Sequence, residues 1–383
     1  MSNKNLSVWV LAVVLTAFSV AMIIVAKNNP QSKCLVLLGN EKSSCVIRLL
    51  DKYIHRREIG SALSFVNNYQ NKDKNFYATD CHGVVHYIGD KAYEFYKKGY
   101  DLDFGKFSNI CVYGFYHAFT SSFILSGDNE GAQIFCDRLN AVSPKKGVGC
   151  YHGIGHGAIY NFHEDYGIVD PIKIINKSID FCEKILSQNK GLMDCVSGVY
   201  DGIGDVVLGS TYQNLTPQKI YRYCEGQPDK YLDDCYQNIS HLVFRKTQVS
   251  FKELVDFVMN SAVIKNKRAA IEGLATIYIV DLKGGDLEVG VAVCQELPND
   301  IKVACLSNMA YKLASDALKN KHYEAARNFC GNRLLSDSEK SNCFALVVVR
   351  LTSFYSKEEL ISQCRKEQID LYKNICLNEL YEN

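Results

Sequence analysis

Apolar residues in the C-terminal part of the chain recur at spacings of three and four, which is the period of an α-helix. In the segment KHYEAARNFC at 321–330, for example, Tyr323, Ala326 and Cys330 fall on one helical face. Short polar stretches separate such segments and have the composition of turns. Three of them are SQNKG at 187–191, GQPDK at 226–230 and LSDSEK at 335–340. The pattern predicts an all-α chain of helices joined by tight turns.

Cysteines mark the same helices. Fourteen of the sixteen fall into pairs whose members are 11 to 14 positions apart. The predicted pairs are Cys34 with Cys45, Cys136 with Cys150, Cys182 with Cys195, Cys224 with Cys235, Cys294 with Cys305, Cys330 with Cys343, and Cys364 with Cys376. This spacing lets a cysteine near the end of one helix meet one near the start of the next, so each pair predicts a helical hairpin closed by a disulfide. Each bridge would stabilise its hairpin by on the order of 3 kcal/mol in the chain-entropy model.

Cys81 and Cys111 stand outside this rhythm. An even number of cysteines favours an eighth, longer disulfide between them. The alternative is that both stay thiolates and join a metal site.

The pairs also reveal a repeat. The first cysteines of successive pairs from Cys182 onward are 42, 70, 36 and 34 residues apart, and 70 is twice 35. A hairpin without cysteines is therefore expected in the long interval, with Met259 and Ala270 at the cysteine positions. Loss of both partners together is what a disulfide predicts, because a single leftover thiol would be reactive. Periods of 34 to 36 residues are typical of stacked helical hairpins.

The segment HYEAARNFC at 322–330 resembles the first helix of a tetratricopeptide-type repeat, although the tryptophan and proline residues characteristic of that family are missing. The resemblance covers one hairpin clearly and the C-terminal 130 residues loosely. It implies an architecture and no catalytic residues. The expected fold is a disulfide-stapled α-solenoid of helical hairpins that follows an N-terminal transmembrane helix.

The expected transmembrane helix is the stretch 7–26, which carries no charged residue. Twenty helical residues span about 30 Å, the thickness of a bilayer core. The interpretation is a signal-anchor with a short cytosolic tail at 1–6. The alternative is a signal peptide cleaved after Ala21 or Ala26, which would release a secreted protein.

The predicted disulfides place the bulk of the chain outside the cytosol, in a periplasmic or extracellular space, as a single-pass membrane protein. The competing interpretation, buried free cysteines in a cytosolic protein, does not explain the paired spacing. The formal net charge is only +1, and the 24 tyrosines have no accompanying basic stripe. These features exclude a nucleic-acid-binding surface.

Histidines cluster in the first half, where five of the nine lie between positions 82 and 156. Four of them form two pairs, CHGVVH with His82 and His86, and CYHGIGH with His152 and His156. On a helix the i, i+4 spacing puts both imidazoles on one face, about 6 Å apart, which suits ligation of one metal ion.

The positions of these residues can be counted from the cysteines of each hairpin. The sixth residue after the second cysteine of successive hairpins is Asp51, His117, His156, Asp201 and His241, and farther on Thr276, Tyr311, Val349 and Glu382. We call this series the +6 column. The segment HGIGH at 152–156 also matches DGIGD at 201–205, which has two carboxylates where the first has two imidazoles. Side chains of the +6 column are therefore expected to converge in the N-terminal half.

Five glycines, at 153, 155, 157, 202 and 204, interrupt segments that otherwise have the pattern of a helix interior, where each costs about 1 kcal/mol relative to alanine. Very close helix packing through a face formed by Gly153 and Gly157, or close approach of a ligand to the backbone, would offset that cost. The alternative is that these segments are turns, which would spoil the i, i+4 geometry.

These observations predict a metal centre in a His/Cys-rich domain at 27–247, followed by plainer helical repeats at 248–383. The expected ligands are His82, His86, His117, His152, His156, Asp201 and Asp205, with zinc, iron or copper as the metal. The protein would then be a metal-dependent enzyme or a metal carrier. Familiar enzyme motifs such as HExxH, CxxC and CxxCH are absent.

Two other functions stay open. A haem held non-covalently by two histidines would use the same residues. A scaffold that binds a protein partner in the solenoid groove would need no metal.

Overall fold

The computed structural model describes residues 30–382, except 71, 74–75, 77–79, 106, 112, 166–169, 187–190, 210–214, 248, 282–286, 317–321, 353–354 and 368–369. Within this part of the chain all regular elements are helices, so the predicted all-α class is confirmed. The expected tail 1–6 and membrane helix 7–26 lie outside the described residues. Among the helices that are described, none combines the length and apolarity needed to cross a bilayer.

The chain divides into two compact units, which meet between Cys111 and position 112. In the first unit α2 (Pro30–Leu35), α3 (Gly39–His55), α4 (Ile59–Gln70) and α6 (Cys81–Lys97) are described. The disulfide of Cys34 with Cys45 ties α2 to α3, and that of Cys81 with Cys111 ties the start of α6 to the end of the unit. A buried ion pair between Lys42 and Asp73 adds a polar contact inside the unit.

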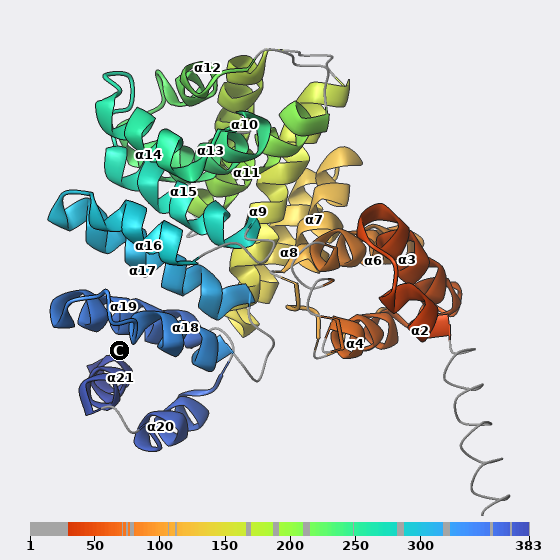
Figure 1. The fold of residues 1–383 in the computed structure, drawn as a ribbon. Coiled ribbons are helices and arrows are strands. Elements are labelled where there is room, and N and C mark those ends of the chain that lie inside the picture. Colours follow the sequence, from red (N-terminus) through yellow and green to blue (C-terminus); the bar gives the residue numbers. More distant parts are fainter. Residues whose placement is uncertain are drawn as a thin grey trace, which may run out of the picture. The chain divides into compact units, whose positions relative to one another are not determined.

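The second unit begins with α7 (Gly114–Leu125) and continues as a series of hairpins (Figure 1). The hairpins are α8 (Asn129–Val142) with α9 (Pro144–Tyr160), α10 (Pro171–Leu186) with α11 (Leu192–Gly209), α12 (Pro217–Tyr221) and η2 (Arg222–Cys224) with η3 (Asp229–Tyr231) and α13 (Leu232–Thr247), α14 (Phe251–Asn260) with α15 (Lys267–Asp281), α16 (Leu287–Gln295) with α17 (Asn299–Asp316), α18 (His322–Cys330) with α19 (Asp337–Leu351), and α20 (Lys357–Arg365) with α21 (Asp370–Glu382). A short π-helical turn, η1 (Asn161–Asp165), extends α9.

The second helices of successive hairpins pack against one another in chain order. Helix α9 lies between α7 and α11, α13 lies between α11 and α15, and α17 lies between α15 and α19. In Figure 1 the helices from α13 to α21 follow one another as a stack from green to blue. The predicted helical repeats are therefore confirmed, and the +6 column of the second unit lies on adjacent helices of this stack.

All eight predicted disulfides are present, with Cα–Cα distances from 5.4 to 6.0 Å, and the described part of the chain contains no free cysteine. The alternative in which Cys81 and Cys111 stay thiolates is wrong. In the second unit the bridges join Cys136 with Cys150, Cys182 with Cys195, Cys224 with Cys235, Cys294 with Cys305, Cys330 with Cys343, and Cys364 with Cys376. Each of these six joins the two halves of one hairpin, which is why the spacing of 11 to 14 residues was sufficient to pair them.

The cysteine-free hairpin is also present, as α14 and α15. Ala270 is fully buried, like the cysteines of the neighbouring hairpins, but Met259 is only half-buried. Val258, one position earlier, is fully buried instead. The predicted position on α14 was one residue too late, because the exact rotation of a helix about its axis depends on its packing partners.

Capping boxes start several of these helices. The side chain of Ser250 accepts a hydrogen bond from the backbone N–H of Glu253, and the Glu253 side chain accepts one from the backbone of Ser250. The same Ser-x-x-Glu arrangement begins α19 at Ser336 and α20 at Ser356. Each box satisfies two backbone donors that the helix itself leaves unpaired, so the first turns are set by local sequence.

Candidate metal centre

Glycines on α9 allow three helices to approach one another very closely. A Cβ added to Gly153 would lie 2.7 Å from the carbonyl oxygen of His117 on α7, and one added to Gly157 would lie 2.7 Å from the Cβ of Ile124, also on α7. Gly155 points the other way, where a Cβ would lie 2.0 Å from the carbonyl oxygen of Cys195 on α11. The expected close packing is thus confirmed, and it involves both faces of α9.

Two more observations fix these helices together. On α11, a Cβ at Gly198 would lie 2.0 Å from the carbonyl oxygen of His152. The hydroxyl of Ser121 on α7 donates a 2.9 Å hydrogen bond to the carbonyl of Gly153. Both glycine-rich segments lie inside continuous helices, so the interpretation of these segments as turns is wrong.

This close packing brings members of the +6 column together. The imidazole rings of His117 and His156 stack with centroids 5.7 Å apart, and those of His117 and His152 with centroids 4.7 Å apart. One ligating atom from each of these three histidines lies within 4.8 Å of those of the other two. Asp201 joins them from α11.

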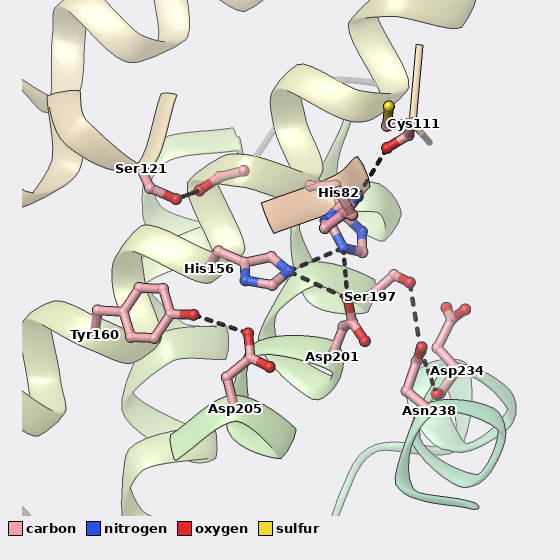
Figure 2. A network of polar contacts seen from close by, with 12 residues as sticks. His82, Cys111, Ser121, His156, Tyr160, Ser197, Asp201, Asp205, Asp234 and Asn238 are labelled. Atoms are coloured by element: carbon pink, nitrogen blue, oxygen red, sulfur yellow. Dashed lines mark hydrogen bonds and ion pairs between the residues drawn. The ribbon is translucent and has the colours of Figure 1, made fainter. Parts of the chain in front are cut away.

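Three of the ligand atoms form a nearly equilateral triangle. His152 Nε2 lies 3.2 Å from His156 Nε2, and Asp201 Oδ2 lies 3.4 Å and 3.3 Å from these two nitrogens. Figure 2 shows His156 and Asp201 facing each other from neighbouring helices. The His156 side chain is 3% exposed, that of His152 is 17% exposed and that of Asp201 is 45% exposed. The triangle therefore has a buried side and a side open to solvent.

The three side chains of the triangle shift one another's pKa values. Burial favours the neutral carboxyl group, but the hydrogen bonds with His152 and His156 outweigh it and hold the pKa of Asp201 well below its ordinary value. Burial alone would lower the pKa of His156, yet the hydrogen bond to Asp201 and the charges of Asp201 and Asp205 raise it. For His152 burial dominates and the pKa is lowered. The interactions with Asp201 thus favour a proton on His156 over a proton on His152.

A second polar contact adjoins the triangle. The hydroxyl of Tyr160 on α9 donates a 2.9 Å hydrogen bond to Asp205 Oδ2 on α11 (Figure 2). Burial and the charge of Asp201 raise the pKa of Asp205, while Arg245 on α13 acts in the opposite direction. Sequence reasoning identified Asp205 but missed Tyr160 and Arg245. Each of these three residues is the tenth after the second cysteine of its hairpin, so counting from the cysteines could have identified them.

His241 on α13 occupies the next place of the +6 column after Asp201. Burial lowers its pKa to about 4, and the positive charges of Arg245 and Lys312 add to this effect, while Asp201 opposes it. His241 is therefore neutral at ordinary pH and lies within electrostatic range of Asp201.

His82 and His86 belong to the first unit, on α6. Their rings lie with centroids 4.4 Å apart, as their i, i+4 spacing predicts, and His82 Nδ1 lies 2.8 Å from the carbonyl oxygen of Cys111. A carbonyl oxygen only accepts, so Nδ1 carries a proton, and in the neutral ring Nε2 keeps its lone pair. Their participation in the same metal centre as His117, His152 and His156 stays a prediction.

Comparison with known protein families, characterised proteins and solved structures finds no match for this chain. The stack of helical hairpins is shown by the structure itself. Since a fold of this kind serves many functions, only the chemistry of the site can indicate what this protein does.

Proposed function

We propose that the second unit binds one divalent transition-metal ion through His152, His156 and Asp201, which would leave the fourth tetrahedral position to water. The observation that supports this most strongly is the triangle of ligand atoms with sides of 3.2, 3.3 and 3.4 Å. In a tetrahedral zinc site with bonds of about 2.0 to 2.1 Å, neighbouring ligand atoms are about 3.3 Å apart. The three atoms thus have the separations that a single ion requires.

Hydrogen bonds among the three groups explain this triangle less well than a bound metal ion does. The ionised carboxylate of Asp201 has no hydrogen to donate, and each imidazole Nε2 carries at most one. If both nitrogens are protonated, two N–H groups face each other across 3.2 Å. If only one nitrogen is protonated, the lone pair of the other nitrogen faces a lone pair of the Asp201 oxygen. One ion in the middle attracts all three lone pairs at once.

The donor set narrows the choice of metal. Imidazole and carboxylate ligands suit zinc, iron or copper, and the near-equal short sides favour zinc, which prefers tetrahedral sites. A bis-histidine haem fits less well, because its axial imidazoles approach from opposite faces of a flat macrocycle. His152 and His156 stand one turn apart on the same helix, and nothing of that width fits between nitrogens 3.2 Å apart.

The open side of the triangle favours an enzyme over a storage site. Because the Asp201 side chain is 45% exposed, water and small molecules can reach an ion held there. A metal ion lowers the pKa of a bound water and makes it a nucleophile near neutral pH. Asp205, placed four residues after Asp201 on α11 and hydrogen-bonded to Tyr160, would accept the proton. We therefore propose metal-assisted hydrolysis, with metal transport as the second possibility.

The compartment is part of the proposal. Eight disulfides favour an oxidising environment. With residues 7–26 as the anchor, the two units would stand in the periplasmic or extracellular space. A protein partner in the solenoid groove stays a prediction without a specific observation in its favour.

The test uses the full chain with its disulfides formed, freed of metal by a chelator and then reconstituted with Zn²⁺ or Co²⁺. We expect one ion per chain by atomic spectroscopy and, for Co²⁺, the intense visible absorption of a tetrahedral complex. His156→Ala removes one ligand and Asp201→Asn removes the negative charge of another, so each should weaken binding at least about tenfold. The matched control His55→Ala removes an exposed histidine of α3 and should have no effect. Failure of the parent protein to bind metal stoichiometrically would contradict the proposal, as would unchanged binding in both variants.

A further inference from the structure

The turn between α2 and α3 in the first unit presents a run of aliphatic side chains to solvent. Residues 35–38 are Leu-Val-Leu-Leu, without a polar side chain among them. Val36 is 81% exposed and Leu38 is 74% exposed, while Leu35 and Leu37 are half-buried. A consecutive run of this kind on a protein surface costs hydration free energy and is typical of a contact surface.

Leu38 also stands where a polar residue would stabilise the helix. It is the N-cap of α3, with φ −129° and ψ 152°, and its side chain makes no capping hydrogen bond. Serine, threonine, aspartate or asparagine at an N-cap accepts a hydrogen bond from a backbone N–H of the first turn. Helices α14, α19 and α20 of the same chain begin with such a serine. The stability of α3 therefore does not explain Leu38, whereas a contact with an apolar partner does.

Polar residues follow the aliphatic turn directly. Lys33 on α2 and Arg48 on α3 are both exposed. A hollow of about 340 Å³ adjoins the turn, and it is lined by Leu37, Asn40, Glu41, Ser44 and Arg48. Its lining carries both signs of charge, as zwitterionic lipid headgroups do. An apolar tip with charged and polar groups beside it matches the boundary between acyl chains and headgroups, because long basic side chains reach back to the headgroups.

The chain itself brings a lipid surface within reach of this turn, if the stretch 7–26 spans a bilayer as proposed. Ten residues separate Ala26 from Val36. Six of these form α2 (Pro30–Leu35), which rises about 9 Å, and the four steps from Ala26 to Pro30 cover at most about 14 Å. Val36 therefore lies no more than about 25 Å from Ala26, whichever path residues 27–29 take. A tether of that length keeps the turn at a high effective concentration near the membrane surface.

We propose that the turn at 35–38 inserts into the lipid bilayer that holds residues 7–26, with Val36 and Leu38 among the acyl chains and Lys33 at the headgroup phosphates. The inference rests on the membrane anchor, which is part of the proposed function. Anchor and turn together attach the first unit to the membrane at two points. Two points of attachment restrict the rotation of the unit about residues 27–29.

The test places a single tryptophan in the turn of the full chain, which is reconstituted with its disulfides formed into vesicles of palmitoyl-oleoyl phosphatidylcholine. Trp9→Phe first removes the one native tryptophan. Leu38→Trp then reports lipid contact, because bromine atoms on the acyl chains near the headgroup quench an indole that lies about 5–10 Å deep. We expect brominated vesicles to lower its emission by about half or more relative to unbrominated ones. Val36→Trp probes the same turn without changing the N-cap, in case the Leu38 variant does not fold.

The matched control is Tyr100→Trp. The guanidinium of Arg57, two residues after the end of α3, stands 3.7 Å from the centre of the Tyr100 ring. Helix α3 has 17 residues and is about 25 Å long, so this ring lies at the opposite end of α3 from Leu38. An indole at position 100 keeps the contact with Arg57 and should retain its emission in brominated vesicles. Washing the vesicles with alkaline carbonate tests the anchor separately.

The outcomes separate the two proposals. Release of the parent chain by carbonate overturns the anchor, and the turn contact with it. Retention of the chain without quenching of either turn tryptophan overturns the turn contact alone. Quenching of Tyr100→Trp that equals the quenching of both turn variants also overturns it, because lipid contact would then not be specific to residues 35–38.

Discussion

The Cα of Gly155 on α9 faces the carbonyl oxygen of Cys195 on α11 so closely that a Cβ on Gly155 would lie 2.0 Å from that oxygen. No side-chain rotation relieves such a contact, because both groups belong to the backbone. The distance between the two helices, and hence between His156 and Asp201, depends on the absence of one methyl group.

Substituting Gly155→Ala is therefore expected to push α11 away from α9. We expect the free energy of unfolding to fall by about 1–3 kcal/mol, the usual cost of overpacking. We also expect metal binding to be lost. The matched variant Gly204→Ala lies on α11, where an added Cβ meets nothing within 4 Å, and should stabilise the helix by about 0.5–1 kcal/mol. Denaturant titration and metal content measure both effects. Equal stability of the two variants would contradict the close approach.

Metal affinity is expected to increase as the pH rises above about 6.5, the ordinary pKa of histidine. The hydrogen bond to Asp201 and the charges of Asp201 and Asp205 outweigh burial and raise the pKa of His156, so at neutral pH a proton competes with the metal for Nε2. In Asp201→Asn this dependence should move to lower pH, although overall affinity falls. Competition with a chromophoric chelator between about pH 6 and pH 8 measures the effect. A flat profile in the parent protein would show that His156 is not a ligand.

His241 is expected to make the metal-free protein less stable in mild acid. Its pKa is about 4 in the folded chain, mainly because of burial, and about 6.5 when unfolded. Between these values the unfolded state binds the extra proton, so the free energy of unfolding falls as the pH decreases from about 6.5 and levels off below about 4. The loss from this residue is about 3 kcal/mol at most.

The check compares denaturant unfolding of the metal-free parent protein, His241→Gln and His55→Gln between about pH 7 and pH 4.5. We expect the fall in stability to be smaller in His241→Gln and unchanged in His55→Gln, whose side chain is exposed. An identical fall in all three proteins would rule out a His241 that stays neutral in the folded chain.

The cysteine-free hairpin offers a test of helix rotation. Val258 and Ala270 are both fully buried, whereas Met259 is half-buried, so Val258→Cys combined with Ala270→Cys is expected to form a ninth disulfide. The gain in stability is up to about 3 kcal/mol. Met259→Cys combined with Ala270→Cys should leave two reactive thiols. Thiol titration under denaturing conditions distinguishes the two, and a disulfide only in the Met259 variant would show that the original spacing was right.

Much of the fold follows from local signals. A disulfide between Cys182 and Cys195 needs only two helices and a turn, so a spacing of 13 residues was enough to predict it. Counting from the cysteines also predicted the +6 column. Its members on consecutive packed helices are His117, His156, Asp201 and His241. Counting could not show that Tyr160 contacts Asp205, because that contact depends on the length of both side chains and on the offset between two helices.

The sequence by itself determined the helical hairpins, their disulfides and the residues of the +6 column, because these depend on backbone hydrogen bonding and on contacts within about 14 residues. Only the tertiary structure decided that His152, His156 and Asp201 meet in one triangle, that His241 stays neutral and that Val258 takes the place of a cysteine. Those outcomes depend on the distance, rotation and curvature of stacked helices. Packing between residues far apart in the chain sets these quantities, and at Gly155 and Gly198 it does so through the absence of a side chain.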